Sequence, residues 1–144
     1  ADVLASWKAV NAVKPYLEKS SCGSIVSIGS TAAVEAFAGA VPYGAMKAAL
    51  LNYFGNLAQE LAPLNIRVNT VSPGPIFIDG GAWDQIKQVM PEIYESTVAA
   101  IPKGRMGSAE EVCVQVALLL SPLSAYTTGT NVVIDGGFTK RIQF

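Results

Sequence analysis

The sequence predicts an α/β fold in which a doubly wound parallel sheet is covered by helices on both faces. Helix-like and strand-like segments alternate along the 144 residues, the order that builds parallel sheets. The strand-like segments are short and rich in β-branched apolar residues, as expected for strands buried inside a sheet. Hydrophobic residues make up 51% of the chain and charged residues 15%, so the chain can build one domain with a real core, or part of one.

The first half of the chain contains two predicted helices and one strand. Residues 5–19 have apolar positions at helical spacing, although Pro15 should bend or break that helix. Residues 24–29 (SIVSIG) are a short β-branched run typical of a buried strand. Residues 30–42 are rich in small residues and predict a loop, and residues 43–61 predict a long helix.

The middle of the chain is less regular. Residues 66–71 (IRVNTV) predict a second strand, closed by a Pro-Gly-Pro turn at residues 73–75. Residues 77–107 contain one expected helix, over 82–90, and are otherwise punctuated by Gly and Pro.

The last part of the chain restores the alternation. Ser108 and the acidic residues after it predict an N-cap that opens a helix as far as Leu120. Residues 131–134 (NVVI) predict a third strand. Three strands are few for such a sheet, because each outer strand has an unpaired edge. We therefore expect further strands of the sheet to lie upstream of residue 1.

The composition excludes several kinds of function. The chain has no His, so it cannot build a Ser/His or Cys/His catalytic site or a His-ligated metal site, and we expect no metal. No run of Lys and Arg indicates nucleic acid, and no apolar segment is long enough to span a membrane. Cys22 and Cys113 fit no metal-ligand spacing, and we expect buried or half-buried free thiols in a cytoplasmic protein.

A tyrosine and a lysine at the start of the second predicted helix form the candidate catalytic pair. Tyr43 and Lys47 are four residues apart, so their side chains share a helix face. An ammonium about 5 Å away, at an effective dielectric near 20, favours the phenolate by roughly 3 kcal/mol. Tyr43 could then give and take a proton. By itself the spacing also fits a helix-surface pair with no role.

Ser30 strengthens the prediction of a catalytic site. It follows a buried strand directly, at the end of the strand where ligands bind in this architecture. A hydroxyl there could donate a hydrogen bond to a substrate carbonyl or a developing alkoxide. Taken alone, Ser30 could equally be a loop-capping residue.

The order of these motifs resembles the short-chain dehydrogenase/reductase family. The similar stretches cover essentially the whole chain: residues 23–30 (GSIVSIGS), 43–47 (YGAMK), 66–74 (IRVNTVSPG) and 128–137 (TGTNVVIDGG). The resemblance implies a Rossmann-type fold, NAD or NADP as cofactor, and reversible hydride transfer between the nicotinamide and a ketone or secondary alcohol. It implies that Tyr43 is the acid/base, that Lys47 eases its proton release and binds the nicotinamide ribose, and that Ser30 orients the carbonyl.

The resemblance also assigns cofactor contacts, with two departures. Pro73 and Gly74 match a turn that approaches the nicotinamide, and Ile76 would offer its backbone to the carboxamide, although an ordinary turn remains an alternative. Many relatives have Thr where this chain has Ile78, so that hydroxyl contact is missing. The family's catalytic Asn falls near residue 2, which is Asp2, so either the Asn lies upstream or Asp replaces it.

The family's Gly-rich phosphate loop has no counterpart in the sequence. We therefore expect residues 1–144 to be the C-terminal catalytic portion of one nucleotide-binding domain, holding the nicotinamide end of the cofactor. Residues 77–107 resemble the family's substrate lid. Its candidate closing side chains, which could instead be core or subunit contacts, are Trp83, Ile86, Met90, Ile93, Tyr94 and Met106.

The resemblance further implies a small-molecule carbonyl or alcohol substrate and a homodimer or homotetramer. The apolar residues of the second helix that could pack on a partner's equivalent helix are Leu51, Phe54, Leu57, Ala58 and Leu61. Two alternatives stay open: a non-catalytic interaction protein that keeps the fold, and a family epimerase or dehydratase that uses the same Tyr/Lys pair.

Overall fold

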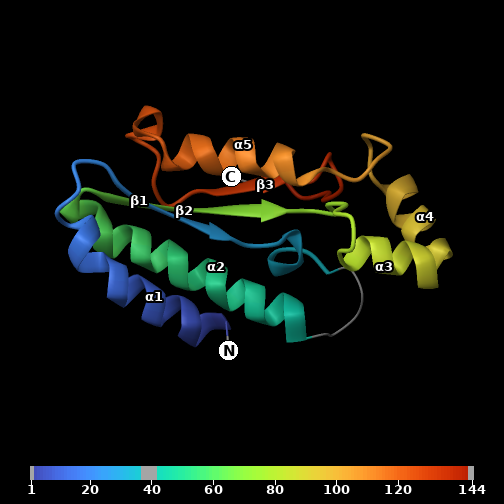
Figure 1. The fold of residues 1–144 in the computed structure, drawn as a ribbon, viewed down its shortest axis with the longest axis horizontal. Coiled ribbons are helices and arrows are strands. Elements are labelled where there is room, and N and C mark those ends of the chain that lie inside the picture. The colour runs from blue at the N-terminus through green and yellow to red at the C-terminus, as the bar shows by residue number, and fades with distance from the viewer. Residues whose placement is uncertain (1, 37–41, 143–144) are drawn as a thin grey trace.

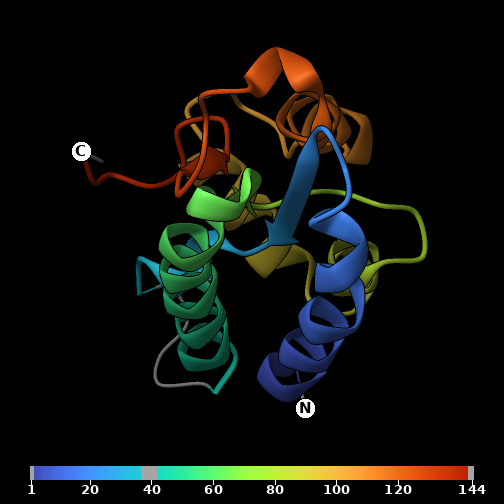
Figure 2. The same cartoon turned by 90° about the vertical axis from the view of Figure 1, so that its left-hand side faces the viewer.

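The computed structural model describes residues 2–36 and 42–142 and has three layers. A parallel sheet lies between α1 and α2 on one face and α5 on the other (Figures 1 and 2). The pair α3 and α4 extends beyond the carboxyl ends of the strands (Figure 1). The elements are α1 (Asp2–Leu17), β1 (Gly23–Ile28), η1 (Thr31–Ala33), α2 (Pro42–Leu61), η2 (Ala62–Leu64), β2 (Ile66–Pro73), α3 (Ala82–Val89), α4 (Pro91–Ala100), α5 (Ala109–Leu120), η3 (Pro122–Ser124) and β3 (Asn131–Ile134).

The sheet confirms the predicted fold class. Its order is β1-β2-β3 and both pairings are parallel. Ile25 is paired with Val68, and Val71 with Val132. Seven of the eight residues of β2 are buried, although the strand contains the polar residues Arg67, Asn69 and Ser72. The side chains of these three residues are hydrogen-bonded within the fold, which makes their burial possible. Within the described part of the chain, β1 pairs only with β2 and keeps its other edge free.

The core has one apolar cluster on each face of the sheet. The cluster under α2 contains Phe54, Leu57, Ala58 and Leu61, each at most 7% exposed. The expectation that these four residues pack on a partner's helix is therefore wrong, because they cover this chain's own sheet. The cluster under α5 is built around Val71, Val112 and Leu119.

Several element boundaries differ from the predicted ones for local reasons. Pro15 does not break α1, because it lies in the last turn and the helix ends two residues later. The loop expected over residues 30–42 contains η1, and its residues 37–41 lie outside the described residues. The helix α4 was not predicted, and its first residue is Pro91, which is compatible with the first position of a helix. β2 extends to Pro73 because that residue pairs with Ile134 of β3.

Arg67 ties β2 to the end of α5. This residue is 9% exposed, and its guanidinium donates hydrogen bonds to the carbonyl oxygens of Leu119, at 2.7 Å, and Ser121, at 3.2 Å. The carbonyl end of a helix carries partial negative charge, so it is a suitable site for a buried cation. Among the described helices, none combines the length and the apolarity needed to cross a membrane.

Candidate active site

The six residues predicted to bind substrate and cofactor all line one cleft. The cleft measures about 500 Å³, and its lining includes Ser30, Tyr43, Lys47, Pro73, Gly74 and Ile76. These residues come from the carboxyl ends of β1 and β2 and from the first two turns of α2. Parallel strands end at the same edge of the sheet, so residues far apart in sequence meet there.

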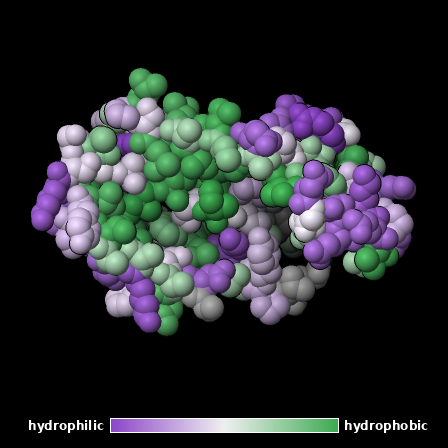
Figure 3. Space-filling model, in the orientation of Figure 1, coloured by the Kyte–Doolittle hydropathy of each residue, from purple (hydrophilic) through white to green (hydrophobic). Residues whose placement is uncertain are grey.

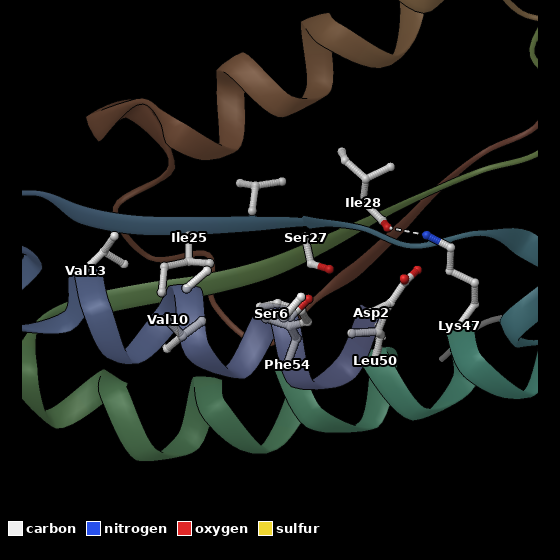
Figure 4. A pocket seen from close by; sticks show the side chains of 13 residues that line it. Asp2, Ser6, Val10, Val13, Ile25, Ser27, Ile28, Lys47, Leu50 and Phe54 are labelled. Atoms are coloured by element: carbon white, nitrogen blue, oxygen red, sulfur yellow. Dashed lines mark hydrogen bonds between the residues drawn. The ribbon is translucent and has the colours of Figure 1, made fainter. Parts of the chain in front are cut away.

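Tyr43 and Lys47 lie on the same side of α2. The Lys47 ammonium is 5.8 Å from the centre of the Tyr43 ring. It also donates a 3.1 Å hydrogen bond to the carbonyl oxygen of Ile28, the last residue of β1 (Figure 4). Tyr43 is 49% exposed, so its ring is accessible from the cleft. The strand end thus fixes the cation beside the phenol.

Ser30 caps η1 and also faces the cleft. Its Oγ accepts a 3.1 Å hydrogen bond from the Ala32 N–H, which is the capping role considered above. A hydroxyl that accepts one hydrogen bond can still donate its own proton. Capping and donation to a ligand are therefore compatible at this position.

Close packing between η1 and α2 brings Ser30 towards Tyr43. A Cβ added at Gly44 would lie 2.8 Å from the carbonyl oxygen of Ala32, nearer than real Cβ atoms come. Glycine at this position lets the turn after β1 rest on the first turn of α2. The residue next to Tyr43 therefore helps to set the distance between the two candidate catalytic side chains.

The turn after β2 is held by β3. The Gly74 N–H donates to the Ile134 carbonyl oxygen at 2.8 Å, and a Cβ at Gly74 would lie 2.5 Å from the Cβ of Asp135. Within this chain, position 74 therefore requires glycine, because the end of β3 comes too close to leave room for a side chain. Partial burial alone would raise the pKa of Asp135, but the hydrogen bonds that its carboxylate accepts from Thr139 and Gly137 outweigh that effect and lower the pKa.

The backbone groups of Ile76 lie beside the cleft and take no part in the bridge to Gly107. Ile76 forms an isolated parallel bridge with Gly107, made by the Gly107 N–H to the Pro75 carbonyl and the Phe77 N–H to the Gly107 carbonyl. In this pattern the N–H and C=O of the middle residue point away from the neighbouring strand. The backbone of Ile76 is thus not used by the bridge, as a residue that holds an amide ligand requires.

α5 contributes a wall of the cleft that sequence reasoning missed. The residues from this helix are Ala109, Val112, Cys113 and Val116. Apolar positions on a helix usually indicate packing in the core, so the sequence contained only a weak signal that these residues line a cleft. Cys113 and Cys22 are free and exposed, so the expectation of buried or half-buried thiols is wrong.

The segment expected to form a lid divides into two groups of residues. Trp83 lines the cleft, and it also lines an adjoining hollow together with Ile93, Ser30 and Tyr43. Met106, by contrast, is 5% exposed and belongs to the core. Tyr94 packs edge-on against Phe77, with ring centres 6.1 Å apart. Figure 3 shows that the α3–α4 end is largely hydrophilic, whereas apolar surface gathers over the middle of the molecule.

Ile78 and Asp2, the two positions where the sequence differs from the pattern expected from the resemblance, line different hollows. Ile78 lines the cleft and is 53% exposed, so an apolar side chain stands at the position where the resemblance led us to look for a hydroxyl. Asp2, the first residue of α1, lines a separate groove that it shares with Lys47 (Figure 4).

Comparison with known proteins gives the family. Residues 2–139 match a family model described as "Enoyl-(Acyl carrier protein) reductase". The isoepoxydon dehydrogenase patN of Aspergillus clavatus is 40% identical over 144 residues, covering 99% of this chain and 56% of the relative. The 3-oxoacyl-[acyl-carrier-protein] reductase FabG of Salmonella typhimurium is 36% identical over 131 residues, covering 91% and 52%.

Solved structures agree with this assignment. YwfH, an NADPH-dependent reductase involved in bacilysin biosynthesis, is 32% identical with a TM-score of 0.87, covering 96% of this chain and 56% of that one. A 3-oxoacyl-[acyl-carrier protein] reductase from Brucella melitensis with bound NAD is 30% identical with a TM-score of 0.79, covering 92% and 47%. The chain spans about half the length of these relatives. The chain belongs to the short-chain dehydrogenase/reductase family.

Proposed function

We propose that this chain carries the catalytic residues of an NAD- or NADP-dependent oxidoreductase that acts on a ketone or a secondary alcohol. The observation that carries the proposal is the meeting of Ser30, Tyr43 and Lys47 in one cleft. Dehydrogenase and reductase activities in the names of similar proteins support it, as do the NADPH dependence and bound NAD of similar structures.

Each residue has a defined part in the proton transfer. In the reducing direction, Tyr43 Oη gives its proton to the carbonyl oxygen of the substrate, and in the oxidising direction it takes that proton back. Ser30 donates a hydrogen bond to the same oxygen and stabilises the charge that develops there. Lys47 supplies a fixed positive charge beside the phenolate. The nicotinamide, when bound, supplies or accepts the hydride.

The residues after β2 fit the nicotinamide end of such a cofactor. Pro73, Gly74 and Ile76 line the cleft opposite α2, and the bridge to Gly107 leaves the amide and carbonyl of Ile76 for a planar amide ligand. Lys47 would bind the ribose. Ile78 can contribute apolar contact but no hydroxyl, so its backbone is the only part able to hydrogen-bond.

The adenosine end requires residues from outside this sequence. The 144 residues contain no Gly-rich phosphate loop after a strand. We infer that residues 1–144 form the C-terminal portion of one nucleotide-binding domain, that residues 77–107 act as the lid over the substrate, and that the enzyme is a cytoplasmic homo-oligomer. Titrating the isolated chain with NADH should show weak or no binding by nicotinamide fluorescence, and clear micromolar binding would contradict this division.

Tyr43→Phe in the full-length enzyme tests the catalytic assignment. Removal of the acid/base should lower kcat by about 10²- to 10⁴-fold. Tyr53→Phe is the matched control, because Tyr53 lies on the same helix, packs edge-on against Phe54 at 5.1 Å, and does not line the cleft. A loss below tenfold in Tyr43→Phe would overturn the proposal. Analysis of the products from ketones and sugar nucleotides separates a reductase from an epimerase or dehydratase that uses the same pair.

A further inference from the structure

A hollow adjoins the cleft and shares the candidate reacting side chains with it. The hollow measures about 420 Å³. The residues that line both spaces are Ser30, Tyr43, Gly74 and Trp83. Lys47, Pro73 and Ile76, which are assigned above to the cofactor, line the cleft and not the hollow. With the nicotinamide in the cleft, the hollow is the space beside Tyr43 that a substrate can fill.

The described lining of this hollow carries no charged side chain. Beyond the four shared residues, it consists of Thr31, Ala32, Pro75, Ile93, Thr97 and Phe138. A carboxylate or a phosphate placed there would lose its water without gaining a cation as partner, and that is costly. The lining therefore favours an uncharged ligand.

The hydroxyl donors of the hollow gather at the point of reaction. Thr97 Oγ1 donates its proton to the Ile93 carbonyl oxygen at 2.8 Å, so that proton is not available to a ligand. Thr31 is only 3% exposed. Ser30 Oγ accepts a hydrogen bond from the Ala32 N–H and keeps its own proton for the substrate oxygen. The donors at Ser30 and Tyr43 suit one carbonyl oxygen, and the remaining lining offers mainly apolar contact.

Two aromatic side chains from distant parts of the chain line the hollow. Trp83 lies in the first turn of α3, and Phe138 follows β3. Ile93, the third residue of α4, adds an aliphatic side chain. Aromatic side chains offer large flat apolar surfaces, and a rigid ring loses less conformational entropy on such a surface than a flexible chain does.

We propose that the substrate is a small uncharged ketone or alcohol whose reacting carbon is part of a ring, and that Trp83 and Ile93 set this preference. The inference rests on the proposed function and narrows it. A sugar nucleotide with its charged diphosphate and an open-chain acyl thioester both fit this hollow poorly. In the reducing direction the ring ketone gains a hydride at its carbon and the Tyr43 proton at its oxygen, which leaves the ring alcohol and the oxidised nicotinamide.

The first test compares two ring ketones that differ in one charge. The methyl ester and the free acid of 4-oxocyclohexanecarboxylic acid share one ring, but only the acid is an anion at neutral pH. In the full-length enzyme, kcat/KM for the ester should exceed kcat/KM for the acid by about 100-fold or more. A ratio below about tenfold overturns the inference.

A lysine at position 93 should shift this preference towards the acid. Ile93→Lys brings an ammonium to the hollow, so kcat/KM for the acid should rise by about tenfold. Ile93→Met, which has a similar length and no charge, should keep the wild-type ratio. Val89→Lys adds the same charge to α3 at a residue that is 76% exposed and lines neither space, so it should keep the ratio too. Equal ratios in Ile93→Lys and Val89→Lys would contradict this placement of the substrate.

The second test compares the ring ester with an open-chain probe, the N-acetylcysteamine thioester of acetoacetate. The ring ester should be the better substrate of the wild type by about threefold or more, and Trp83→Ala should remove this advantage. Trp83→Phe keeps an aromatic ring and should retain it. A wild-type preference for the thioester, or no turnover of the ring ester, overturns the inference. Failure of the proposed function would appear separately, as retained turnover of the preferred ketone in Tyr43→Phe.

Discussion

Substitution of Gly44 by alanine tests how tightly the turn after β1 packs on α2. A Cβ at this position would lie 2.8 Å from the Ala32 carbonyl oxygen, whereas ordinary contact begins at 3.4 Å. The turn would have to move by about 0.6 Å, and its backbone cannot rotate away as a flexible side chain could. Gly55, on the same helix, has nothing within 4 Å of its added Cβ.

The same substitution should therefore have opposite effects at the two glycines. Gly55→Ala gains helix propensity and should stabilise the protein by up to about 1 kcal/mol. Gly44→Ala adds an overpacking cost of about 1–3 kcal/mol, so its net effect should be destabilising by about 1 kcal/mol. For a chain of this length, the melting temperatures of the two variants should differ by at least about 4 °C.

Two assays measure these consequences. Thermal unfolding followed by circular dichroism gives the stability difference between Gly44→Ala and Gly55→Ala. In the full-length enzyme, a displaced η1 would carry Ser30 with it, so kcat of Gly44→Ala should fall by about tenfold while Gly55→Ala stays active. A Gly44→Ala variant that melts higher than the wild type with unchanged kcat would refute the packing argument.

Two further predictions concern the supports of α5. Arg67→Met removes the guanidinium hydrogen bonds to the carbonyl oxygens of Leu119, Ser121 and Thr127, but it also removes the cost of burying a charge. Urea unfolding should therefore show a net loss of about 1–2 kcal/mol in the free energy of unfolding. A more stable variant would contradict this balance. The Glu111 carboxylate accepts hydrogen bonds from the Arg105 guanidinium, which has the larger effect, and from the Ser108 N–H. Together they lower the pKa of Glu111 from 4.5 to about 2. A lowered pKa stabilises the fold above pH 4.5, and this stabilisation is lost as the pH falls towards 2. The excess melting temperature of the wild type over Glu111→Gln should shrink across that window, and a constant difference would refute the assignment.

The order of elements could be predicted from the sequence because it depends on local patterns. The run IRVNTV is buried on both faces as β2, and the Ser108 cap with its acidic first turn begins α5 as expected. The segment containing α4 escaped prediction, because its starting proline resembles a loop signal until the helix after it is seen. Local pattern also could not show whether apolar residues such as Phe54 face this chain's sheet or a partner, since both give the same periodicity.

For the candidate site, too, some features could be predicted from the sequence and others depended on the tertiary structure. The sequence alone determined the chemistry that this chain can offer: a phenol and an amine four residues apart, a hydroxyl at the end of a strand, and no imidazole. Only the tertiary structure decided that Ser30, Tyr43 and Ile76 line one cleft, that a wall of α5 closes it, and that Asp2 shares a groove with Lys47. The reason is physical: spacing along a chain fixes which side chains share a helix face, whereas the pairing of parallel strands decides which distant residues meet at the edge of the sheet.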